Sequence, residues 1–268
     1  MITIISPAKS LDFSKEVIQD KGTKPLFIEE GKELVSILKK YSPEEIGSLM
    51  KISKKLSELN FFRYQRLNMD FHKYSNLSET EKNEYKEAIY AFNGEVYRGI
   101  DIESFGKEDL EFATDHLRIL SGLYGVLRPL DLIREYRLEM GIKLSNSRGK
   151  DLYDFWQETI SEYFNSELYK HSEKAILNLA SVEYSKVVNR KKVSSNIKII
   201  DVMFKESIGD KHKIIAMYAK KARGLMASYI MKNKIDTIEE VKTFNEEGYI
   251  FRQDLSTDNK LVFTRTKN

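Results

Sequence analysis

The chain contains no cysteine, and this absence removes several classes of site. Disulfide bonds, thiolate zinc sites, iron–sulfur clusters and cysteine nucleophiles are all excluded. Histidine is scarce as well, with four residues far apart in the sequence: His72, His116, His171 and His212. Because no pair of histidines has the spacing of a metal-binding motif, we expect no metal site and no other cofactor.

Long apolar runs are also missing. No run approaches the roughly 20 residues needed to span a bilayer, and the first seven residues have no basic region before their short apolar run, as a signal peptide would. We therefore expect a cytoplasmic protein with no membrane partner. Repeats, low-complexity tracts and linkers are absent too, so residues 1–268 are predicted to form a single domain.

Neither sign of charge is in large excess, because the chain has 44 Lys and Arg and 41 Asp and Glu, which gives a net charge of +3. This balance does not by itself imply nucleic acid as a partner, so local clustering must carry that inference. Sequence motifs of three enzyme classes are likewise absent: the Gly-x-Ser-x-Gly elbow, the phosphate-binding P-loop and the dinucleotide fingerprint.

Apolar periodicity predicts strands and helices that do not alternate regularly. Runs typical of strands cover residues 2–5, 175–179, 197–204, 212–218, 249–251 and 260–263. Helical periodicity covers residues 28–41, 107–116, 151–169 and 222–230, with further helices expected from Ser78 and over 237–244. This mixture favours an α+β fold: one compact domain with a mixed central β-sheet surrounded by helices.

Residues 43–66 are predicted to form a helix-hairpin-helix-like element. Ser42-Pro43-Glu44-Glu45 is a strong helix start, and a second helix begins near Ser53. We expect that second helix to bury Leu56, Leu59, Phe62 and Leu67. Such a motif can offer backbone amides to a phosphate, although the usual glycine of the hairpin is missing, so a plain helical pair is the alternative. The surrounding cations are candidate nucleic-acid contacts: Lys51, Lys54, Lys55, Arg63 and Arg66.

Residues 117–156 combine glycines with charged residues in an apolar frame. Glycine permits close backbone approach and positive φ. Arginines beside carboxylates in such a frame are usually paired, because an unpaired buried charge is costly. The stretch is either a structural centre tied by ion pairs or a cleft where an arginine such as Arg128 binds an anion.

This stretch also carries a family resemblance. The segments LSGLYGVLRPLDLI at 120–133, YRLEMG at 136–141 and GKDLYDFW at 149–156 resemble signature blocks of the YaaA family of peroxide stress response proteins. Further blocks follow in order along nearly the whole chain: ISPAK at 5–9, FNGEVY at 92–97, NLAS at 178–181, YAKKARGLM at 218–226 and FNEEGY at 244–249. The resemblance implies a single compact domain with a helix-hairpin-helix element, and a role in oxidative stress linked to control of free iron and protection of DNA.

The densest basic segment is 211–234, which has no acidic residue. On the predicted helix Lys220 lies opposite the apolar stripe, and Lys221 and Arg223 flank it. Cations near a helix N-terminus oppose the helix dipole unless an anion binds there. These three residues are therefore the best single anion-site candidate, with a solvated helix face as the alternative.

Catalysis would need other residues to converge. Ser6 and Lys9 follow the end of a predicted strand, where active-site loops often lie. The remaining candidates for acid–base or positioning roles are Asp131, Asp151, Asn178 and Ser181. The alternative for Asn178 and Ser181 is that they satisfy the backbone of a loop.

Three functional hypotheses follow. The first is a cytoplasmic peroxide stress response protein that binds double-stranded or distorted DNA through a basic cleft, helps to limit damage from free iron, and has no obligate protein partner. The second is an enzyme acting on a nucleotide or nucleic-acid base, with a pocket lined by the 117–156 stretch that would join Ser6, Lys9, Arg128, Asp131 and Lys221. The third, an iron-sequestering protein, is disfavoured by the missing cysteines and the scattered histidines.

Overall fold

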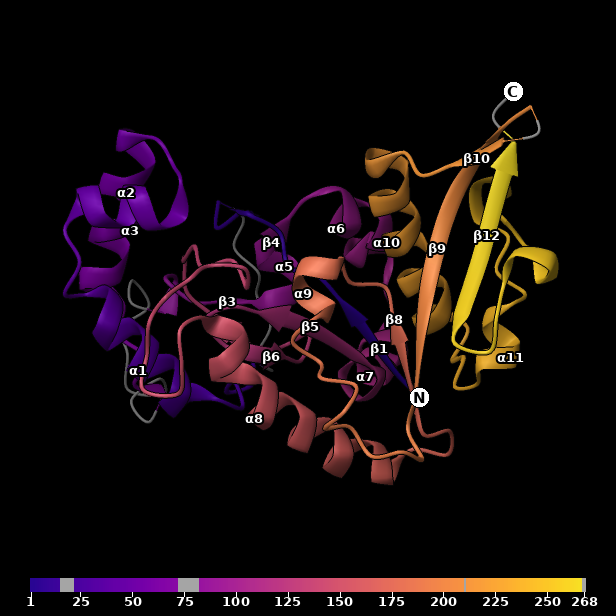
Figure 1. Ribbon diagram of the computed structural model, residues 1–268, viewed down its shortest axis with the longest axis horizontal. Coiled ribbons are helices and arrows are strands. Elements are labelled where there is room, and N and C mark those ends of the chain that lie inside the picture. The colour runs from indigo at the N-terminus through magenta and orange to yellow at the C-terminus, as the bar shows by residue number, and fades with distance from the viewer. Residues whose placement is uncertain (15–21, 72–81, 210, 267–268) are drawn as a thin grey trace.

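A mixed β-sheet runs through the centre of the molecule (Figure 1). The computed structural model describes residues 1–14, 22–71, 82–209 and 211–266. Within them, the sheet has the strand order β11-β12-β9-β8-β1-β5-β6, with β10 paired to β9. Its strands are β1 (Ile2–Ile5), β5 (Leu117–Ser121), β6 (Gly125–Leu127), β8 (Ala175–Asn178), β9 (Lys198–Ile208), β10 (Lys211–Lys213), β11 (Ile250–Phe251) and β12 (Lys260–Thr266).

Five neighbouring strands, β12, β9, β8, β1 and β5, run parallel, while β6, β10 and β11 pair antiparallel. In the register, Thr3 of β1 lies between Leu117 of β5 and Leu177 of β8. Parallel strands end on the same side of a sheet, so Ser6, Ser121 and Asn178 share one edge, which we name the carboxyl edge. The opposite side, where β1, β5, β8 and β9 begin, is the amino edge.

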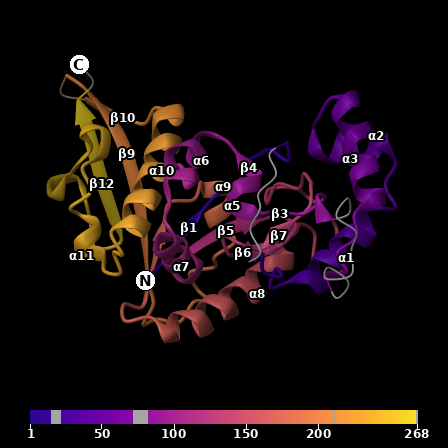
Figure 2. The same cartoon turned by 180° about the vertical axis from the view of Figure 1, so that it is seen from behind.

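Helices cover both faces of the sheet: α7 and α10 lie on one face and α8 on the other (Figures 1 and 2). The helices are α1 (Ile28–Leu38), α2 (Pro43–Met50), α3 (Lys54–Arg66), α5 (Ala88–Ala91), α6 (Glu95–Ile100), α7 (Lys107–His116), α8 (Leu152–Glu167), α9 (Val182–Ser185), α10 (Ala216–Lys232) and α11 (Ile238–Val241). Short 3₁₀ turns occur at Ile102–Ser104, Leu168–Lys170, Glu246–Gly248 and Gln253–Leu255. No helix among the described residues is both long and apolar enough to cross a membrane.

The predicted α+β architecture with a mixed central sheet is confirmed, and so are most of the elements. Ser42 caps α2 in a reciprocal capping box with Glu45, as its sequence predicts. The predicted hairpin after residue 208 forms, but its second strand ends at Lys213 and α10 begins at Ala216. The helix predicted from Ser78 begins outside the described residues. Its later part is helical only over α5 (Ala88–Ala91), because Lys86–Glu87 and Phe92–Asn93 form short strands β3 and β4 that pair with β7 (Leu132–Ile133) and β2 (Ser10–Leu11).

The prediction for the inward face of α3 was wrong. Its apolar stripe points to solvent, with exposed fractions of 38% for Leu56, 44% for Leu59 and 57% for Phe62. Ser57 and Asn60 face inward instead, and their side chains donate hydrogen bonds to carbonyl groups of α3 itself. Small polar residues are needed there because α2 packs close by: a Cβ added at Gly47 would lie 3.3 Å from that of Ser57. Leu67, the fourth predicted core residue, is buried.

The turn between α2 and α3 consists of Lys51-Ile52-Ser53. Lys51 adopts the left-handed conformation (φ 53°, ψ 51°) in which glycine is more usual, and its N–H bonds to the carbonyl of Gly47. The two helices therefore form a closely packed pair without a hairpin glycine.

Trp156 shows why the 117–156 stretch is rich in glycine. The indole is fully buried, and its Nε1 donates to the carbonyl of Gly122 at 2.9 Å. Gly125 has a φ of +67°, and a Cβ there would lie 2.7 Å from the indole ring. Both the conformation and the contact require glycine at position 125.

Candidate functional site

Polar residues from the loops that follow β1 and β8 meet at the carboxyl edge. Ser6, which follows β1, accepts a hydrogen bond from the Ser181 N–H at 2.8 Å and donates one to the Ser181 hydroxyl at 3.3 Å. Asn178, which ends β8, accepts from the Ala180 N–H at 2.9 Å and donates to Asp201 at 2.8 Å. The Asn178 side chain thus satisfies a loop N–H, as the structural alternative predicts, whereas the Ser181 hydroxyl contacts the Ser6 side chain and makes no hydrogen bond to a backbone group of the described residues.

A hollow of about 530 Å³ joins the α2–α3 turn to the carboxyl edge. Its cationic lining residues are Lys9, Lys51 and Lys143, all of which are exposed. Lys9 lies 3.6 Å from the buried Glu139, which also accepts a hydrogen bond from Arg137 at 2.9 Å. Lys9 therefore belongs to a surface with three exposed lysines and two carboxylates, Glu139 and Glu183, of which Glu183 accepts a hydrogen bond from the Gly141 N–H.

A second hollow, of about 840 Å³, lies on the far side of α9. Asp151, Asn178 and Arg223 line it, together with the ion pair that Arg190 forms with Asp201 at 2.7 Å. Asp151 has a local role there, because its side chain caps α8 by accepting the N–H of Asp154 at 3.0 Å.

Arg223 stands out among the residues of this second hollow. Within the described residues its guanidinium has no carboxylate partner, and its Nε atom is buried without a hydrogen bond. Burial lowers the pKa of Arg223, although the group stays charged at neutral pH. An unpaired, half-buried guanidinium facing a hollow is a ready partner for an anion.

The nine cations predicted to contact nucleic acid fall into two groups. Four have carboxylate partners: Arg63 with Glu135 at 2.5 Å, Lys54 with Glu58 at 3.9 Å, Arg128 with Asp131 at 2.8 Å, and Lys221 with Glu247. The other five form no ion pair with a described carboxylate, and these are Lys51, Lys55, Arg66, Lys220 and Arg223. Lys51 and Arg223 line the two hollows, and Lys220 is exposed on α10 beside Arg223.

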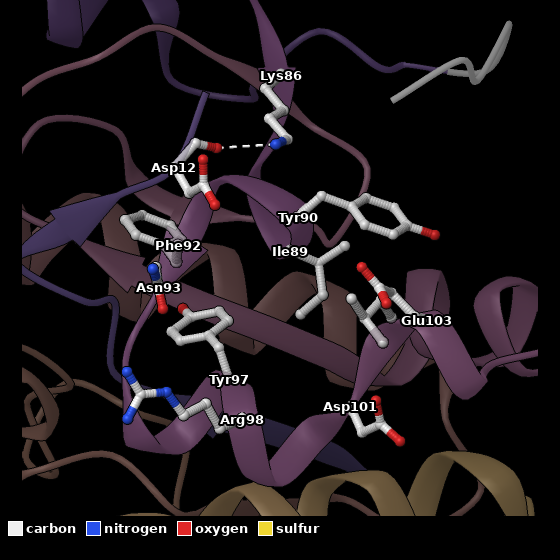
Figure 3. A pocket seen from close by; sticks show the side chains of 11 residues that line it. Asp12, Lys86, Ile89, Tyr90, Phe92, Asn93, Tyr97, Arg98, Asp101 and Glu103 are labelled. Carbon is white, nitrogen blue, oxygen red and sulfur yellow. Dashed lines mark hydrogen bonds between the residues drawn. The ribbon is translucent and has the colours of Figure 1, made fainter. Parts of the chain in front are cut away.

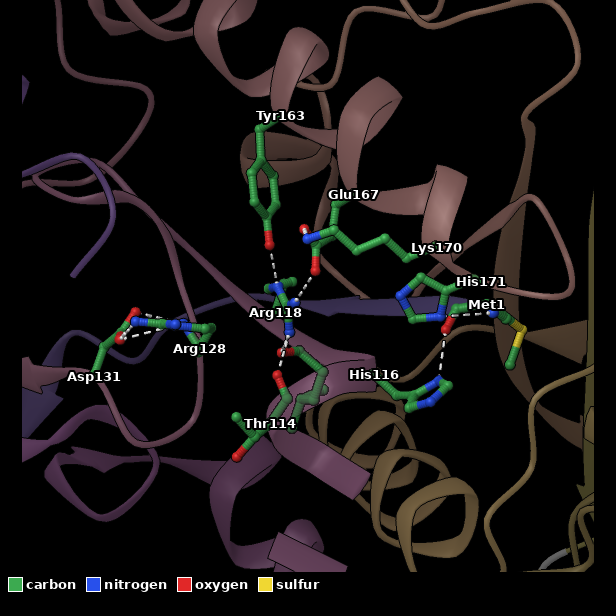
Figure 4. A network of polar contacts seen from close by, with 11 residues as sticks. Met1, Thr114, His116, Arg118, Arg128, Asp131, Tyr163, Glu167, Lys170 and His171 are labelled. Atoms are coloured by element: carbon green, nitrogen blue, oxygen red, sulfur yellow. Dashed lines mark hydrogen bonds and ion pairs between the residues drawn. The ribbon is translucent and has the colours of Figure 1, made fainter. Parts of the chain in front are cut away.

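Arg128 and Asp131 lie away from the other candidates. Arg128 follows β6, which runs antiparallel to β5, so it lies toward the amino edge. Its guanidinium makes two hydrogen bonds to the buried Asp131, at 2.8 and 3.1 Å (Figure 4). The Thr23 hydroxyl donates another hydrogen bond to Asp131 at 2.6 Å. The five residues of the enzyme hypothesis therefore do not share one pocket.

The arginines of the central stretch are structural. Arg118 is 2% exposed and bonds to the Tyr163 hydroxyl at 2.5 Å, the Thr114 carbonyl at 2.7 Å and Glu167 at 3.3 Å (Figure 4). Arg134 pairs with Glu84, and Arg137 with Glu139. These arginines therefore fit the first interpretation of this stretch, a structural centre held together by ion pairs.

A smaller hollow of about 390 Å³ lies behind the carboxyl edge, between α5 and α6 (Figure 3). None of the predicted site residues lines it. The Lys86 amine donates to the Asp12 carbonyl at 2.8 Å at one end, and Tyr97 donates to the Ser6 carbonyl at 3.1 Å. Tyr97, which lines this hollow, thus holds the loop after β1 by its hydrogen bond to Ser6.

One polar cluster escaped the sequence analysis. His116, His171 and Asp236 meet at the amino edge beside Met1, where a donor atom from each of the three lies within 4.8 Å of the others. Burial lowers the pKa of His116 and brings that of His171 to about 4, so both rings are neutral at pH 7. The sequence did contain one indication of this cluster: His116 directly precedes β5, and His171 shortly precedes β8. These two strands flank β1 in the sheet, so residues before them lie at the same edge.

Known proteins match this chain over nearly its whole length. Residues 1–255 match the family model described as peroxide stress protein YaaA. The chain belongs to this family. Relatives described as UPF0246 proteins include one from Saccharophagus degradans, 47% identical over 265 residues and covering 99% of both chains. Another, from Colwellia psychrerythraea, is 46% identical over 268 residues and covers all of both chains. A third, from Albidiferax ferrireducens, is 46% identical over 265 residues, covering 99% of this chain and 98% of its own.

Membership in the YaaA family supports a role in the peroxide stress response. The match includes both hollows of the carboxyl edge and the cations that line them, because it runs from residue 1 to residue 255. The predicted resemblance is thereby confirmed for nearly the full length of the chain.

Proposed function

We propose that this cytoplasmic peroxide stress protein binds DNA across its carboxyl edge and thereby helps to limit damage from free iron. One observation carries the proposal: cations without a carboxylate partner among the described residues lie on both sides of this edge, on the α2–α3 pair and on α10. A cation that is free of internal partners can neutralise a phosphate and release its counterion, and this release supplies much of the affinity of proteins for DNA.

Two helix N-termini strengthen this proposal. Neither α3 nor α10 has a side-chain cap hydrogen bond or an acidic residue in its first turn. Their first turns therefore keep unsatisfied N–H groups and a positive dipole end, which favour phosphate oxygens. The α2–α3 pair would then act as the helix-hairpin-helix-like element, with Lys51 and Lys55 at its turn.

The exposed stripe of α3 indicates which form of DNA would bind. Leu59 and Phe62 are solvent-exposed apolar side chains, and Arg66 lies on the same helix without an ion pair to a described carboxylate. Apolar side chains next to cations can wedge between bases that are already unstacked. This arrangement favours distorted DNA over a regular duplex.

The experiment compares two charge reversals of equal size. Lys51→Glu with Lys55→Glu changes the carboxyl edge, whereas Lys198→Glu with Lys260→Glu changes the starts of β9 and β12 at the amino edge. Affinity for a fluorescent duplex carrying a central mismatch is measured by anisotropy between about 50 and 200 mM salt. We expect the first pair to weaken binding by about 10-fold or more and to reduce the log–log salt slope by about 2, since each lost phosphate contact removes about 0.9.

The amino-edge pair should retain most of the affinity and the full salt slope, because it alters only the long-range field. A second test, Lys220→Glu with Arg223→Gln, probes the α10 side in the same way. Equal losses in the carboxyl-edge and amino-edge pairs would mean that net charge alone drives binding, and no loss in either would remove the carboxyl edge as the DNA site.

A further inference from the structure

The amino-edge cluster places nitrogen and oxygen donors from distant segments around one point. His116 ends α7, His171 precedes β8, and Asp236 lies in the loop between α10 and α11. His116 Nδ1 lies 3.4 Å from Asp236 Oδ1, and Figure 4 shows both imidazoles directed toward Met1. Tetrahedral coordination with metal–ligand bonds of about 2.0–2.1 Å requires about 3.3 Å between ligand atoms. One pair already has this spacing, and all three donors lie within 4.8 Å.

We propose that His116, His171 and Asp236 bind a divalent transition-metal ion. Two imidazole nitrogens and one carboxylate oxygen suit Zn²⁺, Co²⁺ and similar first-row ions, whereas Mg²⁺ and Ca²⁺ prefer sites made of oxygen alone. The ring of His116 is held in place, because it stacks on Phe112 at 3.9 Å and its Nδ1 lies 2.9 Å from the Met1 carbonyl oxygen. This contact uses the same nitrogen that faces Asp236, so an ion bound there would replace the Met1 carbonyl as the partner of Nδ1.

The Met1 ammonium is the competitor for this position. It pairs with Asp236 and lies 3.3 Å from His171 Nδ1. A bound cation would either displace the ammonium from Asp236 or, once the ammonium loses its proton, coordinate the amine as a further nitrogen ligand. Because the cluster is partly exposed at Asp236 (29%) and His116 (15%), an ion can enter from solvent without unfolding the chain.

The test is metal binding by the full-length protein after treatment with EDTA and its removal. Zn²⁺ is titrated calorimetrically, and Co²⁺ is followed by its visible absorption. We expect one ion per chain. Loss of a ligand in His171→Ala, or neutralisation of one in Asp236→Asn, should weaken binding by at least about 10-fold, since removing even an orienting neighbour of a ligand costs about 10–100-fold. His212→Ala is the matched control, because His212 bonds to Ser207 on the β9–β10 hairpin and should bind the ion as the wild type does.

A measurement on the wild type alone keeps the proposal falsifiable if these variants fold poorly. Paramagnetic Co²⁺ should broaden the ring proton resonances of His116 and His171 at concentrations that leave those of His212 sharp. Absence of Zn²⁺ binding, binding unchanged in His171→Ala, or equal broadening of His212 would each overturn the site. In those cases the ammonium–carboxylate pair alone would account for the cluster. The DNA proposal is unaffected by any of these outcomes, because its residues lie at the other edge.

Discussion

The position of α10, which carries Lys220 and Arg223, depends on a contact between two glycines. Gly224 of α10 lies against Gly99 of α6, and a Cβ added at Gly224 would lie 1.9 Å from the Val96 carbonyl oxygen and 2.9 Å from the Gly99 Cα. An ordinary carbon–oxygen contact is about 3.3 Å, so Gly224→Ala requires the helices to separate by about 1.4 Å. The atoms that resist this separation are backbone atoms, which have no alternative rotamer.

The expected loss of stability follows from two opposing effects. Overpacking of this kind costs about 1–3 kcal/mol or more, and here the contact is with backbone, so the upper end applies. Alanine recovers about 1 kcal/mol of helix propensity relative to glycine. We expect a net loss of about 2 kcal/mol or more, which corresponds to a fall in Tm of roughly 4–8 °C in a chain of this size.

The assay is urea unfolding followed by the fluorescence of Trp156, which is the single tryptophan and is fully buried. Gly47→Ala in α2 is the matched control, because the nearest atoms to a Cβ there belong to the Ser57 side chain, at 3.3 Å. The higher helix propensity of alanine offsets the small steric cost of this contact. We therefore expect the free energy of unfolding of this variant to stay within about 1 kcal/mol of that of the wild type. Equal stability of the two variants would refute the inference that α6 and α10 are held at glycine distance.

Two further predictions concern buried charge. Without metal, stability should fall as the pH drops from about 6.5 toward 4, because burial lowers the pKa of His171 to about 4, so the unfolded chain takes up the proton first. Allowing for partial exposure, we expect about 2 kcal/mol between about pH 7 and pH 4.5 by urea unfolding in EDTA, and His171→Ala should remove most of this slope. Arg118→Met should cost about 1–3 kcal/mol, because it leaves the Tyr163 hydroxyl and the carbonyls of Thr114 and Leu117 without their donor, whereas Glu167 keeps its ion pair with Lys170. A loss below about 1 kcal/mol in the same assay would contradict that role for Arg118.

Local signals in the sequence were sufficient for most helices and strands. The capping box at Ser42 fixed the start of α2, and short apolar runs located β1 and β8. The inward face of α3 could not be predicted from its own periodicity, because the close approach of α2 at Gly47 decides which side is buried. The same limit applies to His116 and His171, which are 55 residues apart and meet only because β5 and β8 both pair with β1.

The sequence also could not show which basic residues are paired with carboxylates in the folded chain, and this limited the prediction of the DNA-binding residues. The basic residues of 211–234 look equivalent in the sequence, yet Lys221 is held by Glu247 whereas Lys220 and Arg223 have no described carboxylate partner. Glu247 comes from the turn before β11, and its own pKa is lowered by the hydrogen bond from Lys221. A lysine in such a pair must release its carboxylate before it can neutralise a phosphate, so its net gain on binding DNA is smaller than that of an unpaired cation. Pairing in the fold, more than basic density in the sequence, therefore decides which side chains can contribute to the carboxyl edge as a DNA-binding surface.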